Sequence, residues 1–508
     1  MPFIKPFAPT YTKSTLLAIA VATALTQGCG GSSGSDSGNN TPNPPTTRTL
    51  NDYPIPTNYA FQDKFGIGIS SVSYTGQTKR MILIEDLVDY MLNLKDDASE
   101  DVLTNLNFFY KFDGGSADDE PFRYSLSTPI IPGPNKTGNT YGDIASGKSL
   151  VGKTAGNDPA LINGEFFGWT TPLDGTSTAP NNPEALVQHF FSLLDSISTD
   201  EASEIIRLTG GITADIDVPY VTASGLDLRQ LIQKFLLGAV AYSQGTGDYL
   251  KADYSTANDT QEGNAPYSMV EHEWDEAFGY FGAARNYNDY TDDELASKGG
   301  RPEFSNGYND ANGDGLIDLT SEVNLGNSTN CAKRDRGATV ATDFTATAFN
   351  AFLAGRTILN ATPGNLDTEA LALLEEAQLT ASRTWEKCIA ATVIHYINDT
   401  LNDMDNFAVD GYTSLSAFRD HAKHWAEMKG FALGLQFNPD SPFRADATTL
   451  QQLKDVLALM GDAPVLPDGT QNGVAFTGGV TAYQADLEQA RDIMQNIYNF
   501  APENVLNW

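Results

Sequence analysis

Apolar residues recur at helical spacing along most of the chain. Intervals of three and four residues place them on one face of a helix, whereas a half-buried strand would alternate residue by residue. This spacing predicts helices over residues 80–94, 183–197, 227–244, 342–359 and 368–401. Residues 448–460 and 481–500 repeat the pattern, and Thr448 and Gln451 predict a capping box at the start of the first of these two helices.

Three stretches interrupt the helical pattern. Residues 50–70 mix prolines, glycines and aromatic residues, and we expect them to be extended or irregular. Residues 112–182 are rich in Gly, Pro, Asn, Ser and Thr, and residues 283–332 are rich in Asn, Asp and Gly. Loops this long in a compact chain are usually functional or organised by an ion. The expected fold is therefore mainly α, with one or two packed helical bundles over residues 50–508 and these loops inserted.

The first residues have the pattern of a bacterial lipoprotein signal. Lys5 and Lys13 precede the apolar run STLLAIAVATAL, which is too short to span a bilayer and is followed by TQGC. We therefore expect a signal peptide at residues 1–28 and a lipid on Cys29. Residues 29–49 are rich in Gly, Ser, Asn and Pro and predict a flexible tether. The chain would then be anchored at a membrane surface, and Gly30 favours the outer membrane.

The charge of the chain excludes some partners. Lys and Arg number 31 against 65 Asp and Glu, so the formal net charge is -34. Such a charge disfavours nucleic acid and anionic lipid, and it suits cation binding. The segment from Gly142 to Ser149, GDIASGKS, matches the P-loop pattern, but neither a strand before it nor a helix after it is indicated. We therefore expect no nucleotide.

The chain has three cysteines, and two remain if Cys29 carries a lipid. In an oxidising compartment Cys331 and Cys388 could form one disulfide. The alternative is two separate buried thiols.

The segment DANGDGLIDLTSE has the residue order of an EF-hand calcium loop. Side-chain oxygens stand at positions 1, 3, 5 and 9, a glycine at position 6 and an apolar residue at position 8. The expected calcium ligands are Asp310, Asn312, Asp314, the carbonyl of Leu316, Asp318 and Glu322. Position 12 is Ser321 and the glutamate follows one residue later, while the flanking residues do not have helical patterns. The predicted role of Ca²⁺ is therefore structural; the alternative is a solvated turn.

The segment MVEHEWDEAFGYFG, residues 269–282, raises a second metal question. On a helical wheel its apolar residues share one face, while His272, Asp275 and Glu276 lie close together on the other. Either this face is solvated, or it faces a second layer and binds a metal. Imidazole and carboxylate at this spacing suit Fe, Zn or Mn.

His421 and His424 are the candidate partners of that face. His421 falls on the apolar face of its helix and His424 borders that face. A bundle that brought them near His272 would form a metal site; the alternative is a buried, hydrogen-bonded His421 and a boundary His424. His395 has Asp399 four residues later, a pairing common in protein cores.

Several stretches together resemble a family of bacterial lipoproteins known only as a domain of unknown function (DUF 4856). They are SSVSYTGQTKRMILIEDL, LRQLIQKFLLGAVAYSQ, VEHEWDEAFGYFG, NGDGLIDLTSEVNLG, CAKRDRGA and HAKHWAEMKGFALGLQFNP. A weaker similarity points to imelysin-like proteins, whose motif is G-x-H-x-x-E. His272 matches the histidine, whereas Val270 replaces the glycine and Asp275 the glutamate. The imelysin resemblance implies a helical envelope protein that acts in iron or haem acquisition.

Three functions follow as expectations. The first is a membrane-anchored, calcium-binding helical protein that binds Fe, Zn or a metal complex for uptake, with an outer-membrane receptor or another envelope protein as a possible partner. The second is a metallopeptidase of the imelysin type. The third is a non-catalytic interaction protein of the cell surface.

Overall fold

The fold is mainly helical, as the apolar spacing predicts. The structure is a computed structural model, and it describes residues 48–94, 101–112, 140, 142, 147–172, 177–199 and 204–508. The signal peptide, Cys29 and nearly all of the tether lie outside these residues, as does part of the segment 142–149. Arg48–Trp508 form one compact unit.

The helices of the first half of the chain alternate with long irregular segments. They are α1 (Thr75–Leu92), α2 (Val102–Tyr110), α4 (Pro183–Thr199), α5 (Leu228–Leu236), the π-helix η5 (Leu237–Tyr242), α6 (Ser243–Gly247) and α7 (Met269–Phe281). The expected helix 227–244 is thus a continuous run of α5, η5 and the start of α6.

The second half is more regular. Its helices are α8 (Asp292–Leu295), α9 (Asn327–Arg336), α10 (Phe344–Ala361), α11 (Thr368–Asp405), α12 (Leu415–Gly434), α13 (Ala447–Met460), α14 (Gly479–Tyr498) and α15 (Pro502–Asn507). Single 3-10 turns are η1 (Leu50–Asp52), η2 (Val151–Lys153), η3 (Ile162–Gly164), η4 (Thr209–Gly211), η6 (Tyr249–Lys251), η7 (Tyr287–Asp289), η8 (Leu435–Phe437) and η9 (Pro442–Arg444).

Two short hairpins add the strands of the described chain. β1 (Ile205–Arg207) pairs antiparallel with β2 (Thr213–Asp215), and β3 (Thr470–Gln471) pairs with β4 (Val474–Ala475). Strands of two or three residues carry too little alternation to be recognised in a sequence.

Two local expectations are wrong. α13 is capped by Asp446, which accepts from the amides of Thr448 and Thr449, so the capping box lies two residues before the predicted pair Thr448 and Gln451. The loop expected to run to residue 332 ends earlier, because α9 begins at Asn327. The polar stretch NSTN was not expected to be helical, since it has no apolar spacing of its own.

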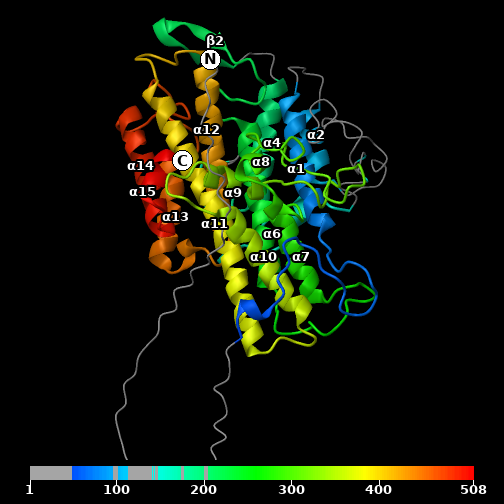
Figure 1. Cartoon of the computed structure of the whole chain (residues 1–508). Helices are drawn as coiled ribbons and strands as arrows, with labels where there is room; N and C mark the ends of the chain where they lie inside the picture. Colours follow the sequence, from blue (N-terminus) through cyan, green and yellow to red (C-terminus); the bar gives the residue numbers. More distant parts are fainter. Residues whose placement is uncertain are drawn as a thin grey trace, which may run out of the picture. The chain divides into compact units, whose positions relative to one another are not determined.

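The core is organised around α11, which packs between α10 and α12 (Figure 1). α7 packs on α1 and α10, and α5 packs on α12. The indoles of Trp274, Trp385 and Trp425 are fully buried. η5 and α12 approach closely at a glycine pair, since a Cβ on Gly238 would stand only 2.7 Å from the Cα of Gly434. The main apolar core therefore runs through every long helix.

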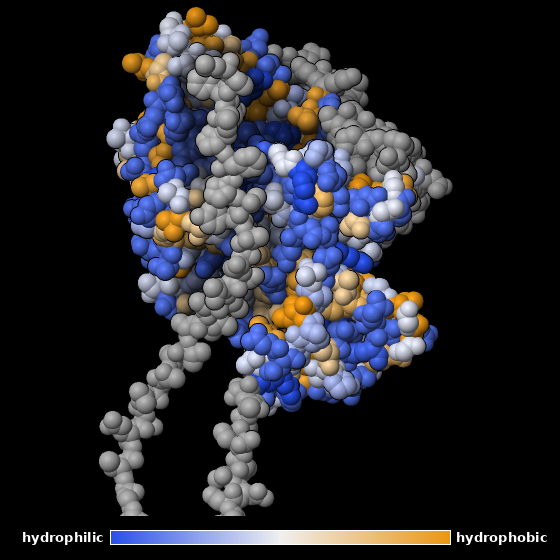
Figure 2. Space-filling view, in the orientation of Figure 1, coloured by the Kyte–Doolittle hydropathy of each residue, from blue (hydrophilic) through white to orange (hydrophobic). Residues whose placement is uncertain are grey.

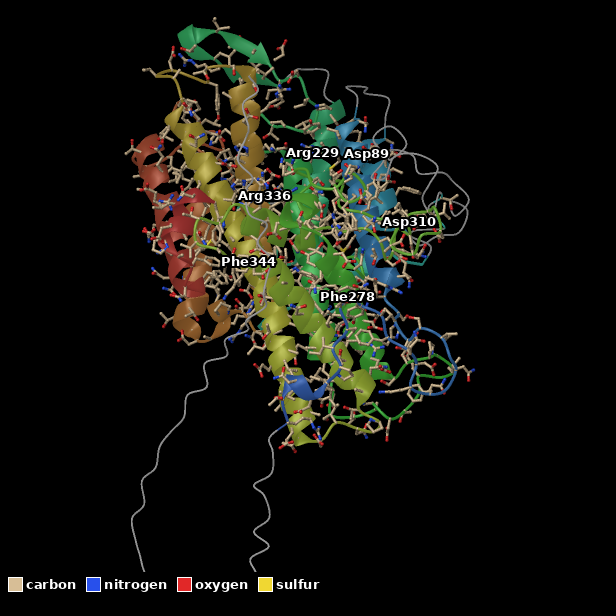
Figure 3. The ribbon with its side chains drawn as sticks, viewed as in Figure 1. Asp89, Arg229, Phe278, Asp310, Arg336 and Phe344 are labelled. Carbon is tan, nitrogen blue, oxygen red and sulfur yellow. A yellow bond between two sulfur atoms is a disulfide. The ribbon has the colours of Figure 1, made fainter. Side chains whose placement is uncertain are left out.

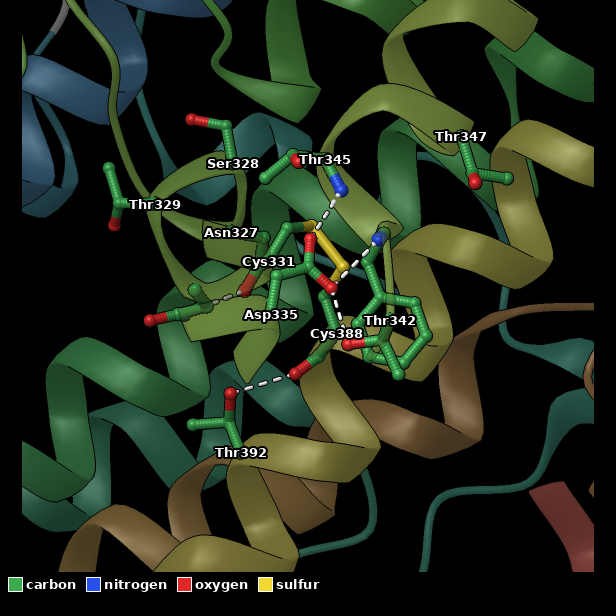
Figure 4. The surroundings of a disulfide bond; sticks show 12 residues. Asn327, Ser328, Thr329, Cys331, Asp335, Thr342, Thr345, Thr347, Cys388 and Thr392 are labelled. Carbon is green, nitrogen blue, oxygen red and sulfur yellow. Dashed lines mark hydrogen bonds between the residues drawn. A yellow bond between two sulfur atoms is a disulfide. The ribbon is translucent and has the colours of Figure 1, made fainter. Parts of the chain in front are cut away.

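Cys331 of α9 and Cys388 of α11 are joined in a disulfide (Figure 4). The two cysteines are 57 residues apart in the sequence, and both are buried. One turn further along α9, the Asp335 carboxylate accepts from the Thr342 hydroxyl and from the backbone amides of Phe344 and Thr345 (Figure 4). α9 is therefore fixed to α11 by a covalent bond and to the start of α10 by hydrogen bonds.

Most of the face shown in Figure 2 is hydrophilic, in agreement with the acidic composition. Exposed apolar side chains include Ile205 and Ile212 of the β1–β2 hairpin and Val409, which is close to it in the fold because Thr209 bonds to Asp410. Within the described ranges, no helix is both long and apolar enough to cross a membrane.

Candidate functional site

The loop of residues 310–322 is ordered around the carboxylate of Asp310 (Figure 3). One carboxylate oxygen accepts from the amides of Gly313 at 2.8 Å and Asp314 at 3.2 Å, and the other accepts from Gly315 at 2.8 Å. Gly315 has a φ of +86° with open space around it, so backbone conformation and not crowding requires glycine there. The first and sixth positions of the loop thus have the roles that a calcium loop gives them.

Glu322 closes the loop from its other end. One of its carboxylate oxygens accepts from the amides of Ala311 and Asn312 at 3.1 and 3.2 Å, and the other accepts from the amide of Asp318 at 2.8 Å. The side chain is buried, and burial raises the pKa of its carboxyl. The glutamate one place beyond position 12 therefore reaches back across the whole loop.

The other candidate calcium ligands lie in the same turn. Asn312 accepts from the amide of Asp314 and Asp314 from the amide of Leu316, each at 2.8 Å. Asp318 accepts from the hydroxyls of Thr320 and Ser321. Burial tends to raise the pKa of Asp318, but these hydrogen bonds, the backbone amide of Thr320 and the charge of Arg285 together outweigh it and lower the pKa.

The loop is anchored to the core below it. Ile317 at position 8 is buried, as is Leu319, while Asn312 and Asp314 are exposed. The Asn324 side chain donates to the carbonyl of Gly307 and accepts from the amide of Ala284, so it ties both ends of the loop to the end of α7. The exposed side of the loop is where a cation could approach.

The acidic residues of α7 divide between two environments. Asp275 and Glu271 face the core, where the fully buried Arg356 of α10 donates to Asp275 at 2.8 Å and to Glu271 at 2.6 Å. Tyr59 donates to Asp275 at 2.7 Å, and the ammonium of Lys64 lies 3.6 Å from Glu271. Two carboxylates and two cations balance in this cluster. The side chain of Asp275 is therefore held in an ion pair and does not lie beside His272 on a solvated face.

His272 lies on the other side of α7. Its Nδ1 is 3.0 Å from a carboxylate oxygen of Glu262 and its Nε2 is 3.7 Å from one of Glu276, while its ring packs at a tilt against Tyr267. About a quarter of the side chain is exposed. The imidazole of His272 therefore lies between Glu262 and Glu276, whereas the sequence predicted it beside Asp275 and Glu276.

His421 is a buried core residue. Its Nδ1 is 2.8 Å from the hydroxyl of Tyr412, and its ring packs edge-on against Phe407. Burial lowers the pKa of His421 to about 3, so the ring is neutral at physiological pH. This matches the alternative of a buried, hydrogen-bonded histidine.

His424 joins α12 to α11. Its Nδ1 lies 2.7 Å from Asp403, and its Nε2 lies 3.9 Å from Asp399, which is also 3.3 Å from the Nε2 of His395. Burial tends to lower the pKa of His424, but the hydrogen bond to Asp403 and the charges of Asp403 and Asp399 together outweigh it and raise the pKa. The i, i+4 pairing of His395 and Asp399 was readable from the sequence, whereas its link to His424 was not.

Of the five predicted ligands, His272 and Glu276 of α7 lie 3.7 Å apart, whereas Asp275 pairs with Arg356. His421 bonds to Tyr412 and His424 to Asp403, so the structure does not join the five in one site. In the part of the chain that the structure describes, which includes the carboxylates of the 310–322 loop, no group of three or more His, Cys, Asp and Glu side chains is arranged to hold a metal ion. The sequence missed the roles of Glu271 and Arg356, although two signals were present. Glu271 completes a capping box with Ser268, and Arg356 is a lone charge within an apolar helix.

A sequence model of one protein family matches residues 185–438, which is half of the chain. Its description is Domain of unknown function (DUF4856). No curated protein and no solved structure matches the chain at a significant level. The matched segment contains α5 to α12, the 310–322 loop and the disulfide, whereas α1, α2, α13, α14 and α15 lie outside it.

Proposed function

The chain belongs to the family described as Domain of unknown function (DUF4856), and from that premise we propose that it is a calcium-binding helical protein of the cell envelope. The loop of residues 310–322 binds one Ca²⁺ ion, which has a structural role. A lipid on Cys29 anchors the chain to a membrane, and Gly30 favours the outer membrane.

The observation that carries the proposal is that backbone amides of one loop fix the carboxylates of both Asp310 and Glu322, although the two like charges repel each other. Each carboxylate is already oriented by three backbone amides, and the donors between them are all oxygens. Ca²⁺ takes six to eight oxygen ligands from carboxylates, amides and carbonyls in this order of positions. The ion would also neutralise acidic side chains that the fold gathers in one turn.

A structural role fits the surroundings of the loop better than a sensor role. A sensor loop stands between two paired helices that reopen when the ion binds. Here the 310–322 loop is followed by four further residues before α9, and its ends are tied to α7 through Asn324. Binding would therefore stabilise the connection between α7 and α9.

The test is thermal unfolding of the mature chain with Ca²⁺ and with a chelator. We expect Ca²⁺ to raise the melting temperature, since a ligand at a hundred times its Kd adds about 2.7 kcal/mol of stability. Asp314→Asn should weaken calcium binding about tenfold or more because it removes one charge from the ligand set.

Asp468→Asn is the matched control. Asp468 is exposed and accepts from the amide and hydroxyl of Thr470, so it forms the same kind of turn outside the loop. Calcium stabilisation that is lost equally in both variants, or an unchanged melting temperature together with no bound calcium on elemental analysis, would refute the proposal.

Iron or haem acquisition stays a prediction, as does the metallopeptidase alternative. The contacts of His272 favour a polar surface over a transition-metal site, because Asp275, one of the predicted ligands, pairs with Arg356 instead. Elemental analysis of the mature chain beside His272→Ala decides the matter. Iron or zinc that is present in the parent and lost in the variant would support uptake, and its absence from both would move the function to surface interaction.

A further inference from the structure

A pocket lies beside α6, η6 and the start of α7, elements that pack together (Figure 1). Its volume is about 350 Å³, within the usual range of about 300–1,000 Å³ for ligand pockets. The lining combines acidic and apolar side chains, and all of it falls in the segment of residues 185–438 that the family model matches. We call it the α7 pocket.

Two acids of the lining have no partner. The carboxylates of Asp248, at the end of α6, and Glu273, on α7, form no hydrogen bond or ion pair with another described residue. Both side chains are half-buried. Burial, followed by repulsion from Glu276 and Asp248, raises the pKa of Glu273 to about 7, and burial also raises the pKa of Asp248. A bound cation would compensate these charges.

The nearby lysines do not compensate them, because each lysine already has an acid of its own. Lys251, the lysine in the lining, lies 2.6 Å from a carboxylate oxygen of Asp440. Lys153 faces Asp248, but it forms an ion pair with Asp158, whose carboxylate also faces Asp248 and repels it. Neither lysine therefore brings a free positive charge to the pocket.

A third acid adds to the negative charge. Asp253 accepts hydrogen bonds from the amide and the hydroxyl of Ser255, which is neutral, so the charge of this carboxylate remains. His272 precedes Glu273 in the sequence, but its imidazole lies between two other glutamates. The α7 pocket therefore has a surplus of negative charge, from three carboxylates beside one lysine that is paired elsewhere.

The apolar part of the lining indicates what kind of cation would bind. Met269 is 52 % exposed although its side chain is long and apolar, and Val270, Ala252 and Ala257 lie in the same lining. A metal ion gains nothing from such neighbours, since Ca²⁺ takes six to eight oxygen ligands. An ammonium group donates up to three hydrogen bonds to carboxylates, and an alkyl chain attached to it can cover a flexible methionine.

We propose that the α7 pocket binds a small primary amine in its protonated form, whose ammonium group donates to Asp248 and Glu273 and whose alkyl part packs against Met269. The pocket shares no residue with the loop of residues 310–322. It therefore stands or falls independently of calcium binding there.

The test is titration calorimetry of the mature chain at about pH 8, with Ca²⁺ kept at a fixed saturating concentration. The ligands are ethylamine, butylamine and 1,4-diaminobutane. At least one should bind saturably with a stoichiometry of one, and butanol should bind at least about tenfold more weakly than butylamine because it lacks the charge. Failure of the whole series, equal binding of butanol, or displacement of the amine by an equal concentration of Zn²⁺ would overturn the proposal.

Variants locate the binding. Glu273→Gln and Asp248→Asn should each weaken the affinity for the amine about tenfold or more, since each removes one charge that meets the ammonium group. Glu375→Gln is the matched control, because Glu375 is an exposed glutamate of α11 outside the pocket. Equal losses in Glu273→Gln and Glu375→Gln, or no loss in either, would refute the site.

A measurement on the unaltered chain removes any dependence on how the variants fold. Oxidation of Met269 by peroxide, read by mass spectrometry, should be slowed by a saturating amine, because the bound alkyl chain covers the exposed thioether. Butanol at the same concentration should leave the rate of oxidation unchanged. Equal rates with and without the amine contradict the proposal.

The affinity should also depend on pH. Charged and titratable groups face Glu273 from its own helix and from the elements packed against it: His272, Glu276, Asp248, Lys251, Asp253, Tyr254 and Glu262. Because the pKa of Glu273 is about 7, the affinity for an amine should be full above about pH 8 and fall as the pH drops through 7 and the carboxylate takes up a proton. The ligand itself stays protonated over this range, since alkylamines lose their proton near pH ~10.

The variants separate this effect from other titrations. Glu273→Gln should make the pH profile of amine affinity shallower, whereas Glu375→Gln should keep the profile of the parent. A flat profile in the parent, or a profile that Glu273→Gln leaves unchanged, would contradict the role of Glu273.

Discussion

At the scale of single residues, Arg356 has the clearest consequence. Its buried guanidinium donates hydrogen bonds to the carboxylates of Asp275 and Glu271 and to the backbone carbonyl of Ser71. Replacing one partner of a buried ion pair leaves the other charges uncompensated, which costs about 3–5 kcal/mol. We expect Arg356→Met to lower the free energy of unfolding by that amount in chemical denaturation.

A second substitution separates charge from packing. The triple variant Arg356→Met, Glu271→Gln, Asp275→Asn removes the two acids that Arg356 neutralises, so it should recover part of the loss. If the triple variant instead loses the sum of the free energies of unfolding that the separate substitutions cost, the three side chains are not electrostatically coupled.

The same residues show what the sequence could and could not provide. The wheel placed Asp275 beside His272, because a wheel separates polar from apolar residues and cannot show a second layer. Two other parts of the chain form that layer. Tyr59 donates to Asp275 from the segment of residues 59–74, and Arg356 donates to it from α10. A polar residue that is buried and paired looks, in a sequence, like one that is solvated.

At the scale of elements, η5 and α12 approach each other closely at a pair of glycines. Gly238→Ala would place a Cβ 2.7 Å from the Cα of Gly434, which is backbone and cannot rotate away. Overpacking of this kind costs about 1–3 kcal/mol. We expect Gly238→Ala to lower the melting temperature accordingly.

Gly364→Ala provides the control for that prediction. Gly364 has nothing within 4 Å of an added Cβ, and its φ is not in the left-handed region. The same chemical change there should leave stability unchanged or raise it slightly, since alanine reduces the freedom of the unfolded chain. Equal melting temperatures for the two variants would show that the glycine contact is not tight.

Long helices were predictable and short elements were not. The apolar spacing gave α4, α10 and α11 to within a few residues, because each buries a continuous face over several turns. α9 was missed because its sequence NSTNCAKRDR is mostly polar, and the disulfide and the contacts of Asp335 hold it in place.

At the scale of the whole molecule, helices distant in sequence share one core. α1 packs on α5 and α7, and α14 packs on α11. The order of these contacts could not be read from the spacing, which says which face of a helix is apolar but not which helix covers it. For this reason the sequence could not show whether His272 lies near His421 and His424. The loop of residues 310–322 is a single local segment, so its residues lie close together whichever helices pack around it.

The disulfide between α9 and α11 has a consequence for damage to the chain. Residues 339–341 lie between the two cysteines and are exposed, so they present a place where a protease can cut. A chain cut there remains one covalent molecule, because Cys331 and Cys388 still join its two pieces. The cut protein should migrate as a single band on a denaturing gel without reductant and as two fragments with it. Two fragments without reductant would show that the bond is absent, whereas a single band means that a protein cut by a protease keeps its two pieces together.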